Sequence, residues 1–385
     1  MKSVVILSMD NLYYGNTAAV VRMNNYARAL ALANVNVYLV STYALATKQD
    51  WIEVETRIFT LPKDRIKSGK GYNLFYVLSL VRKLKKRVES IKGESVVLNY
   101  SNPSSLLLDI VLLLSFNKRL RVWGEINEVR KYASGSGETI RGRIYSNVLE
   151  KTYKHYKGLV FISRHIQEYY ATRTKKSIVV PILSDCSGTF HLSTRLDTLD
   201  FVFVGTISFP KENLEELLEG FLLFAKEQPN ARLELYGILA GSNRRRLEEF
   251  IAKANATENI IYKGSLQHAE VPDVLSSAGA LILPRANNKQ NFYGFSTKLS
   301  EYAVSGTPII LTNTGVAADY FEDGVSCLMC DGYDRESFRA KFEELANMSL
   351  AEKQKLAENA YLVAKKHFDY RLYSTILKDF LFETS

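Results

Sequence analysis

The segment from Gly294 to Pro308 has the residue types and spacing best suited to chemistry in this sequence. It follows an apolar, strand-like run (280–284) and a polar loop (285–291), and it opens a predicted helix with a glycine and hydroxyl residues. A strand, a loop and a helix start in this order form an anion site, because the first amides of a helix lack intrahelical acceptors and carry positive potential. Glu301 lies about two helical turns after Gly294 and is expected to project from about the same face. We therefore expect one pocket that holds a phosphate at its rim and a hydroxylated group behind it, as a sugar nucleotide requires.

Two further cationic positions follow predicted strands of the same half. Gly205 comes directly after the predicted strand Phe201–Val204 and lets the backbone pass close to a ligand, and Lys211 could reach a phosphate there. Arg285 follows the apolar run, and its planar guanidinium can bind a phosphate bidentately. An ordinary turn beside solvated cations is the alternative for each position.

The first half offers comparable residues after its own predicted strands. Gly15 and Asn16 lie between the first predicted strand and helix, where close approach to a phosphate and ordinary helix capping are the alternatives. Glu125 and Asn127 follow another predicted strand, together with Glu128. These side chains could orient sugar hydroxyls or supply a base, and a pair of solvated acids is the alternative.

The chain has 385 residues, enough for two domains, and its charge is divided unequally between its halves. Residues 1–190 carry 29 Lys and Arg against 14 Asp and Glu, a net charge of +15, whereas residues 191–385 carry 21 against 27, a net charge of −6. A basic half suits an anionic membrane surface, a lipid-linked phosphate or a nucleic acid. The densest basic run, 82–87, belongs either to such a surface or to a solvated helix face. No nucleic-acid reading motif accompanies it, so we expect no nucleic-acid partner.

Cysteine and histidine usage indicates neither a disulfide framework nor a metal site. Three cysteines favour a reducing compartment and a cytoplasmic location. Cys327 and Cys330 lack a second ligand pair and the five histidines show no metal-ligand spacing, so we expect no metal and no cofactor. The apolar run 106–114 is shorter than the ~20 residues that span a membrane, and it contains Asp109. We expect a buried helix there, with membrane insertion as the alternative.

Strand and helix signals alternate along the chain, which predicts an α/β fold of two doubly wound parallel sheets. A polar linker (186–200) would separate an N-terminal domain (1–185) from a C-terminal domain (201–366), with a last helix (367–385) packing back toward the N-terminal domain. Open parallel sheets bind ligands beyond the carboxyl ends of their strands. We therefore expect two Rossmann-like domains that face each other across a cleft.

Apolar periodicity places the individual elements. Strands are predicted near residues 4–8, 35–40, 96–99, 120–123, 159–162, 201–204, 232–236, 259–262, 280–283, 308–311 and 327–330. Helices are predicted near residues 18–33, 74–89, 104–116, 140–157, 214–226, 244–254, 271–278, 295–304 and 335–347.

From Phe201 onward the chain resembles the retaining glycosyltransferases of family 4, which have the GT-B fold. The segments that carry the resemblance are FVFVGTISFPKEN, LELYG, YKGSLQHAEVPDVLSSAGALILPR and GFSTKLSEYAVSGTPIILTNTGVAADYFEDGVSCLM. Their order and spacing cover about 130 residues. The segment IYSNVLEKTYKHYKGLVFIS also looks like the family's last N-domain helix and strand. The form of the longest segment most resembles enzymes that build bacterial capsular, exopolysaccharide or lipopolysaccharide chains.

The resemblance implies roles for individual residues and exposes two departures. It gives Glu301 the ribose hydroxyls and Lys211 the diphosphate. Tyr293 stands where the family has a glutamate, and a phenol can donate to a sugar or stack on it but cannot accept as a carboxylate does. Thr206 stands where the family has an arginine, and Arg285 could supply the missing charge.

The resemblance also marks the rest of the donor site. Lys211, Glu301 and Arg285 would form its catalytic group. The remaining donor-binding positions are the Gly205 turn with Thr206, the base-receiving loop and the residues from Tyr293 to the phosphate-contacting helix start: Gly264, Ser265, Leu266, Tyr293, Gly294, Phe295, Ser296, Thr297 and Lys298.

The implied reaction transfers a sugar from a nucleoside-diphosphate sugar, with retention of configuration, to a glycan or a polyprenyl-diphosphate-linked acceptor. Cationic side chains and helix amides would neutralise the leaving diphosphate without a metal. The basic first domain would bind the acceptor, peripherally at the cytoplasmic face of an anionic membrane. Another GT-B sugar-nucleotide enzyme, such as an epimerase or an inverting transferase, and a binding or scaffold protein without turnover are the alternatives.

Overall fold

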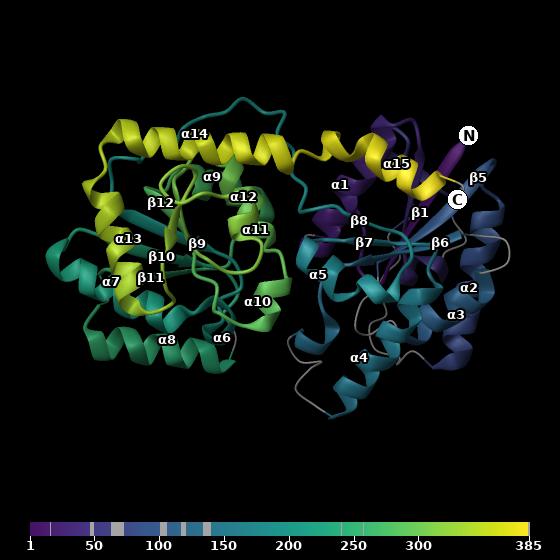
Figure 1. The fold of residues 1–385 in the computed structure, drawn as a ribbon, viewed down its shortest axis with the longest axis horizontal. Helices are drawn as coiled ribbons and strands as arrows, with labels where there is room; N and C mark the ends of the chain where they lie inside the picture. The colour runs from purple at the N-terminus through teal and green to yellow at the C-terminus, as the bar shows by residue number, and fades with distance from the viewer. Residues whose placement is uncertain are drawn as a thin grey trace. The chain divides into compact units, whose positions relative to one another are not determined.

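The computed structural model describes residues 1–15, 17–46, 50–62, 73–100, 106–116, 121–133, 140–239, 241–256 and 258–383. The chain divides into two compact units (Figure 1). The first unit comprises Met1–Leu183 and Asp369–Ser385, and the second comprises Ser184–Phe368. The segment 186–200, which the sequence assigned to a linker, thus belongs to the second unit, and the chain returns to the first unit at Asp369.

The first unit is built on an eight-stranded sheet in the order β3-β4-β2-β1-β5-β6-β7-β8. Its strands pair in parallel except for β3 with β4. Their central residues form almost continuous buried apolar runs, as expected for a sheet covered on both faces. The strands are β1 Lys2–Ser8, β2 Asn36–Ser41, β3 Ile52–Glu55, β4 Ile58–Thr60, β5 Glu94–Tyr100, β6 Arg121–Ile126, β7 Leu159–Phe161 and β8 Ser177–Val179.

Helices of the first unit connect these strands. They are α1 Ala18–Leu32, α2 Leu74–Glu89, α3 Leu106–Phe116, α4 Ile140–Thr152 and α5 Arg164–Tyr169. The apolar run at 106–114 forms α3, which packs between α2 and α4, and its Asp109 is buried and accepts a hydrogen bond from Asn99 Nδ2 (2.7 Å). One face of this helix is therefore buried, as predicted, whereas Leu114 on it is 79% exposed. None of the described helices is both long and apolar enough to cross a membrane.

The last described residues complete the core of the first unit. Helix α15 (Ser374–Phe382) packs against α1 and contributes Leu377, Phe380 and Leu381 to one buried cluster with Met23. The ring of Phe380 lies 4.6 Å from that of Trp123, between centroids. The first unit is therefore discontinuous in sequence, and its core needs both ends of the described chain.

The second unit is a six-stranded parallel sheet in the order β11-β10-β9-β12-β13-β14. Its first strand, β9, lies between the second and the fourth, so the direction of winding reverses between β9 and β12. This is the strand order of a dinucleotide-binding Rossmann fold. The strands are β9 Asp200–Val204, β10 Arg232–Tyr236, β11 Ile260–Gly264, β12 Ala280–Leu283, β13 Ile309–Thr312 and β14 Leu328–Cys330.

The helices of the second unit enclose an aromatic core. They are α6 Phe209–Glu212, α7 Leu214–Glu227, α8 Gly241–Ala254, α9 Val271–Ser276, α10 Lys289–Tyr293, α11 Thr297–Val304, α12 Ala317–Tyr320, α13 Arg335–Asn347 and α14 Leu350–His367. Phe201 of β9 is in edge-on contact with Phe221 and Phe342, at centroid distances of 6.0 and 4.7 Å. Such contacts hold α7 and α13 against the sheet and fix the strand ends that carry the polar loops.

The predicted and observed elements differ most often where elements are short, although α14, with 18 residues, was also missed. The sequence placed a loop at 285–291, but residues 289–293 form α10, whose start is capped because Asn288 Oδ1 accepts from the Asn291 amide (2.9 Å). Strands β3, β4 and β8 and helix α14 were not predicted. The three strands have only three or four residues, too few for a periodic signal.

Candidate functional site

The carboxyl ends of β9 and β12 are where the strand order of the second unit reverses. In an open parallel sheet this reversal leaves a crevice between the loops that follow the two strands, and ligands bind there. The segment after β9 carries Gly205 and Thr206 in a turn and Lys211 in α6, and the loop after β12 carries Arg285. The topology therefore brings the candidate residues of both loops to one end of one sheet.

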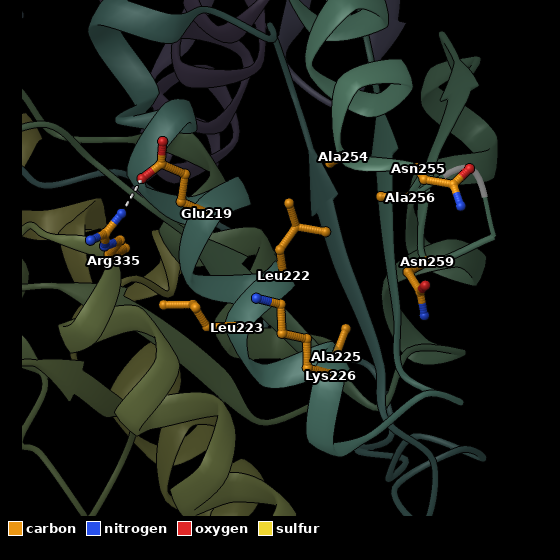
Figure 2. A pocket seen from close by; sticks show the side chains of 10 residues that line it. All are labelled: Glu219, Leu222, Leu223, Ala225, Lys226, Ala254, Asn255, Ala256, Asn259 and Arg335. Atoms are coloured by element: carbon orange, nitrogen blue, oxygen red, sulfur yellow. Dashed lines mark hydrogen bonds and ion pairs between the residues drawn. The ribbon is translucent and has the colours of Figure 1, made fainter.

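A surface pocket of about 410 Å³ lies elsewhere in the second unit, over α7 (Figure 2). Residues of α7, the C-terminal end of α8 and the segment before β11 line most of it, together with Arg335, which forms an ion pair with Glu219 (3.2 Å). None of the predicted site residues lines this pocket. We therefore place the candidate site at the strand ends.

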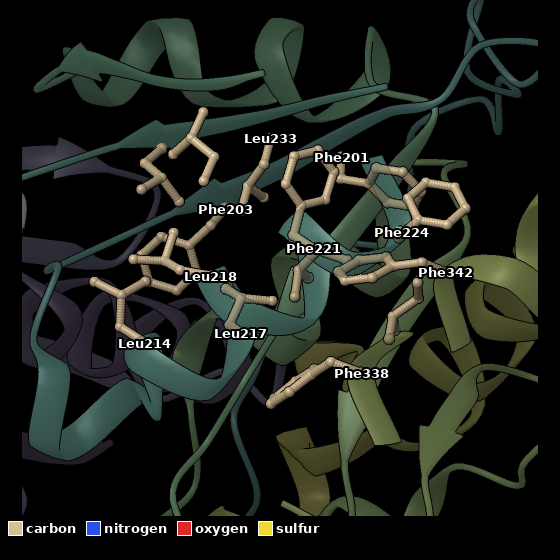
Figure 3. Close-up of a cluster of buried hydrophobic side chains, with 14 of the residues drawn as sticks. Phe201, Phe203, Leu214, Leu217, Leu218, Phe221, Phe224, Leu233, Phe338 and Phe342 are labelled. Atoms are coloured by element: carbon tan, nitrogen blue, oxygen red, sulfur yellow. The ribbon is translucent and has the colours of Figure 1, made fainter. Parts of the chain in front are cut away.

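Lys298 extends from the first turn of α11 across the turn that follows β9. Gly205 has a φ of +153°, and a Cβ atom there would lie 1.8 Å from Cε and 2.2 Å from Nζ of Lys298. Glycine at this position therefore leaves the space that the lysine side chain occupies. The Lys298 ammonium also lies 4.3 Å from the ring centroid of Phe203, a member of the core cluster (Figure 3).

Glu212, at the end of α6, is the counterion of two cations. Its Oε1 lies 3.1 Å from Nζ of Lys298 and 3.2 Å from Nη1 of Arg285. The Glu212 side chain is only 2% exposed, and its Oε2 is buried without a hydrogen-bond partner among the described residues. This carboxylate is therefore held mainly by the cations around Oε1. We call Glu212, Lys298, Arg285 and Lys211 the Glu212 cluster.

The charges of the Glu212 cluster act on one another. Burial would raise the pKa of Glu212, but the positive charges of Lys298, Arg285 and Lys211 outweigh it and lower that pKa. The pKa of Lys298 falls to about 8, because burial and the like charges of Arg285 and Lys211 outweigh the attraction of Glu212. Three basic side chains thus share one carboxylate. The positive charge of the cluster is greatest below pH 8, where Lys298 is protonated, and it favours an anionic ligand.

Arg285 is fixed by contacts that also join the two loops. Its Nη2 donates to Ser296 Oγ (2.6 Å), and its Nη1 donates to Asn291 Oδ1 (3.3 Å). Asn291 Nδ2 in turn donates to the carbonyl oxygen of Lys211 (2.8 Å). Side chains therefore connect the loop after β9, the loop after β12 and the start of α11, and they hold the guanidinium in one orientation.

The start of α11 adds backbone donors. Ser296 is the N-cap residue, and its side chain makes no capping hydrogen bond because its oxygen accepts from Arg285 instead. Thr297 and Lys298 are the first two helical residues, so their amides have no acceptor within the helix. These amides lie beside cationic side chains, an arrangement that suits phosphate oxygens.

The whole chain is similar in structure to several solved proteins. Sucrose-phosphate synthase from Thermosynechococcus elongatus matches with a TM-score of 0.75 and 15% identity, over 98% of each chain. Anabaena HepE, solved with UDP and glucose, matches with a TM-score of 0.71 and 14% identity over 99% of each. TarM of S. aureus, solved with UDP among its ligands, matches with a TM-score of 0.72 and 11% identity over 100% of each. The protein has the GT-B fold. Identities this low show the fold and not the activity.

Two sequence comparisons agree with the GT-B fold. Residues 191–363 match the family model described as "Glycosyl transferases group 1", and this range contains the whole Glu212 cluster. A 2-deoxystreptamine N-acetyl-D-glucosaminyltransferase from Niallia circulans is 27% identical over 54% of this chain. The match spans 55% of that relative's length.

Glu301 lies on α11, three residues after Lys298, and is half-buried. Burial raises the pKa of Glu301, and the charges of His268 and Lys298 oppose the rise. His268 follows the loop expected to receive a base, in which Gly264 has a φ of +84°. In that loop Ser265 is exposed and Leu266 is half-buried. The loop after β11 therefore lies near enough to Glu301 to act on its charge.

The residues just before α11 correct one sequence expectation. The helix begins at Thr297 and not at residue 295, and Gly294 is extended (φ −74°, ψ 162°). Gly294 and Glu301 therefore share no helix face. Tyr293 ends α10 and is half-buried, with its ring edge-on to that of Phe292 at 5.0 Å.

Three other predicted donor-site residues differ in how far they are buried. The ring of Phe295 is buried and stacks on Tyr320 (5.4 Å), so it belongs to the packing of the second unit. Thr206 is exposed beside the Gly205 turn. Lys211 is half-buried, and its charge acts on Glu212.

Glu125, expected to contact sugar hydroxyls or act as a base, is fully buried in the first unit. Its Oε1 accepts from Arg22 Nε at 2.7 Å, and burial raises its pKa against the charges of Arg22 and Arg130. Arg22 also donates to the carbonyl oxygens of Pro181 (2.6 Å) and Val180 (2.8 Å). The carboxylate is thus an internal counterion and is not presented to a ligand. We call the pair and its partners the Arg22 cluster.

The remaining first-unit candidates lie at turns. A Cβ atom on Gly15 would lie 2.8 Å from the carbonyl oxygen of Asn11, so a tight turn explains this glycine. Asn127 is half-buried and donates from Nδ2 to the Tyr100 hydroxyl. Asn16 lies outside the described residues.

The sequence interpretation missed Glu212, the residue that organises the site. An acidic residue after a lysine in a loop usually indicates a solvated charge, and only the fold shows that this carboxylate is buried. Asn291 was missed for the same reason, although Asn288 three residues earlier is a helix-capping signal that could have revealed α10.

Proposed function

We propose that the protein is a glycosyltransferase that moves a sugar from a nucleoside-diphosphate sugar to a glycan or a polyprenyl-diphosphate-linked glycan, with retained anomeric configuration. The observation that carries this proposal is the excess of positive charge in the Glu212 cluster, at the winding reversal of a unit that matches glycosyl transferases group 1. The biological role that we propose is the synthesis of bacterial surface polysaccharides. The UDP found in the solved HepE and TarM structures supports a nucleotide ligand for this fold.

In the proposed reaction, the bond between the sugar and the diphosphate breaks, and the acceptor oxygen forms a bond to the same carbon. Negative charge grows on the leaving diphosphate. Lys211, Arg285, Lys298 and the first amides of α11 would stabilise that charge, and losing one such donor typically costs ~3 kcal/mol of transition-state stabilisation. The acceptor proton would pass to the leaving phosphate, and Glu301 would hold the ribose hydroxyls.

We propose that these side chains make a divalent metal ion unnecessary. The support is their number, because three basic groups meet at one place. The test is transfer activity after dialysis against EDTA, compared with the same enzyme supplied with Mg²⁺ or Mn²⁺. Equal rates support the proposal, and a loss of activity that Mg²⁺ restores contradicts it.

We propose that the first unit binds the acceptor at an anionic membrane surface. The net charge of +15 on residues 1–190 supports this. Large apolar side chains that α2, α3 and α4 expose also support it. Ile140, Ile144 and Val148 repeat every four residues on α4 and border a groove of about 520 Å³ shared with Leu106 of α3. An exposed apolar stripe beside basic residues is typical of a surface that contacts lipid.

Flotation with lipid vesicles tests the membrane proposal. The wild type should bind vesicles that contain phosphatidylglycerol and should not bind pure phosphatidylcholine, with binding lost at high salt. Ile144→Glu should weaken binding, whereas Leu362→Glu, at an exposed position on α14, is the matched control and should not. Equal flotation of all three proteins would contradict the proposal.

The experiment that decides the function is a thermal-shift screen against UDP-, GDP- and ADP-sugars, followed by product analysis. Stabilisation by one donor, with slow hydrolysis that Glu301→Ala and Lys211→Ala abolish, supports an active enzyme. A product whose anomeric configuration is opposite to that of the donor would identify an inverting transferase. Binding without turnover, for which Tyr293 and Thr206 would be the cause, would identify a binding protein. No shift with any nucleotide would overturn the proposal.

A further inference from the structure

Lys298 and Arg285 of the donor site are both held by Glu212 before any ligand binds. An anion that enters the crevice at the ends of β9 and β12 meets Lys298 and Arg285, whose side chains are only 13% and 14% exposed. Long basic side chains normally lose conformational freedom when they bind an anion, and this loss weakens binding. Here both cations already contact the same carboxylate oxygen, so that loss has occurred before the ligand arrives.

The position of Lys298 depends on Glu212 and on Gly205 together. Glu212 Oε1 attracts the ammonium at 3.1 Å, and the absence of a side chain at Gly205 leaves the space through which the lysine passes. The ammonium also makes a cation–π contact with the ring of Phe203. The lysine therefore places a positive charge beside Thr206, a residue that brings no charge of its own.

We propose that Glu212 is a positioning residue that holds the Lys298 ammonium against the Gly205 turn and the Arg285 guanidinium beside that ammonium, so that a diphosphate meets both cations as a preformed pair. The ligand class follows from the geometry, because Lys298 and Arg285 are two cations held side by side at the winding reversal, and a diphosphate has two phosphate groups side by side. This inference rests on the proposed function only for the identity of the diphosphate as part of a sugar nucleotide.

Positioning by Glu212 and simple charge neutralisation predict opposite changes in anion affinity when Glu212 is replaced by glutamine. If Glu212 only offset positive charge, Glu212→Gln would strengthen anion binding, since it removes a negative charge from the site. If Glu212 positions the cations, Glu212→Gln weakens binding, because both lose the partner that holds them. We expect about tenfold weaker binding of inorganic pyrophosphate to Glu212→Gln, with affinity largely retained in Glu212→Asp.

Lys298 supplies a second readout through pH. The groups that act on it are Glu212 and Lys211 of α6, Arg285 of the loop after β12, and Glu301 of its own helix. With a pKa of about 8, Lys298 loses its charge as pH rises through that value. Wild-type affinity for pyrophosphate should therefore fall between pH 7 and 9.5 relative to Lys298→Met, whose affinity is already low. The ionisation of pyrophosphate is common to both proteins and cancels in the ratio.

The experiment is calorimetric titration of the full chain with inorganic pyrophosphate and with inorganic phosphate. The variants are Glu212→Gln, Glu212→Asp, Lys298→Met and Gly205→Ala, and Lys226→Met is the matched control because it removes an exposed lysine of the same unit. Gly205→Ala displaces Lys298 without altering any charge, so it remains informative if the Glu212 variants fail to fold.

The expected result is weaker pyrophosphate binding in Glu212→Gln, Lys298→Met and Gly205→Ala, with no change in Lys226→Met and weaker binding of phosphate than of pyrophosphate. Tighter binding to Glu212→Gln, or wild-type binding by Lys298→Met, would overturn the proposal. Equal affinity for phosphate and pyrophosphate would also overturn it, since the cluster would then not be shaped for a diphosphate. If the expected pattern appears but no sugar nucleotide is turned over, the proposed function fails and this inference stands.

Discussion

Each unit buries a carboxylate against basic side chains near the ends of its parallel strands, yet the two clusters differ in charge balance. In the Arg22 cluster Arg22 forms an ion pair with Glu125, and its other nitrogens are used by two carbonyl oxygens and the Tyr26 hydroxyl. The charge of Arg130 also acts on Glu125, but Arg130 has its own ion pair with Glu128 (3.6 Å). In the Glu212 cluster one glutamate forms ion pairs with both Lys298 and Arg285, and the charge of Lys211 also acts on it. The Arg22–Glu125 pair is balanced in charge and fully buried, whereas two cations on one carboxylate leave positive charge that favours binding of an anion.

The comparison teaches that burial of a polar residue does not by itself indicate function. Glu125 is more deeply buried than Glu301, and its pKa is also raised by burial, but its partner is internal. The functional signal is the unbalanced charge together with a place where the strand order reverses. Substitutions in the two clusters should therefore have different consequences.

The largest effect is expected from Arg22→Met, which leaves Glu125 buried without its partner. We expect the free energy of unfolding of the first unit to fall by about 3–5 kcal/mol. Both tryptophans of the chain, Trp51 and Trp123, lie in the first unit, so denaturant unfolding followed by tryptophan fluorescence reports on that unit. The double variant Arg22→Met with Glu125→Leu should recover much of the loss. A loss of less than 1 kcal/mol in the single variant would mean that the pair is not structural.

The next effect should fall on activity. Arg285→Met removes one of three cations from the Glu212 cluster, so Glu212 keeps other positive partners. We expect kcat to fall about a hundredfold, by the loss of ~3 kcal/mol of leaving-group stabilisation, while unfolding changes by about 1 kcal/mol. Transfer rates and calorimetric unfolding measure the two quantities, with Lys226→Met as the control. A variant that is destabilised as strongly as Arg22→Met would remove the difference between the clusters.

A smaller effect is expected from Glu301→Gln. We expect nucleoside-diphosphate binding to weaken about tenfold, because an amide accepts fewer hydrogen bonds from ribose hydroxyls than a carboxylate. The raised pKa of Glu301 gives a pH test. Wild-type binding should weaken as pH falls through that pKa and the carboxylate is protonated, and the weakening should be absent in Glu301→Gln. Titrations between pH 7.5 and 5 check this, and parallel pH profiles would contradict it.

The smallest effect is expected from Tyr293→Glu, which restores the carboxylate that the family resemblance implies at this position. Tyr293 is half-buried at the end of a short helix, so stability should change by less than about 1 kcal/mol. The relative kcat/KM for different donor sugars should change by up to about tenfold. Leu350→Ala, at an exposed position at the start of α14, should leave these ratios unchanged.

Much of the fold could be predicted from the sequence because its signals are long and periodic. Helix α1 was predicted at 18–33 and observed as Ala18–Leu32, and β9 was predicted at 201–204 and observed as Asp200–Val204. The start of α11 was misplaced by two residues, although Ser296 is of a residue type that favours the N-cap and could have marked it. Helix boundaries depend on such local contacts more than on apolar periodicity.

The site was less predictable than the fold. Lys211 and Arg285 stood out because they follow strands, and the observed topology brings their loops to one end of a sheet. Glu212 and the side-chain direction of Lys298 could not be inferred, because burial and the 3.1 Å contact between them come from packing of residues far apart in the sequence. Glu125 shows the reverse case, since a residue type suited to chemistry became an internal counterion.

The discontinuous first unit has a consequence for biosynthesis. A ribosome delivers residues 1–183 first, but the cluster that contains Met23 stays open on one side until Leu377, Phe380 and Leu381 of α15 have been made. Ser184–Phe368 holds its own aromatic core and can close before that point. The unit that emerges first is thus the unit that finishes last, and in the meantime its exposed apolar surface is what a nascent-chain chaperone would meet.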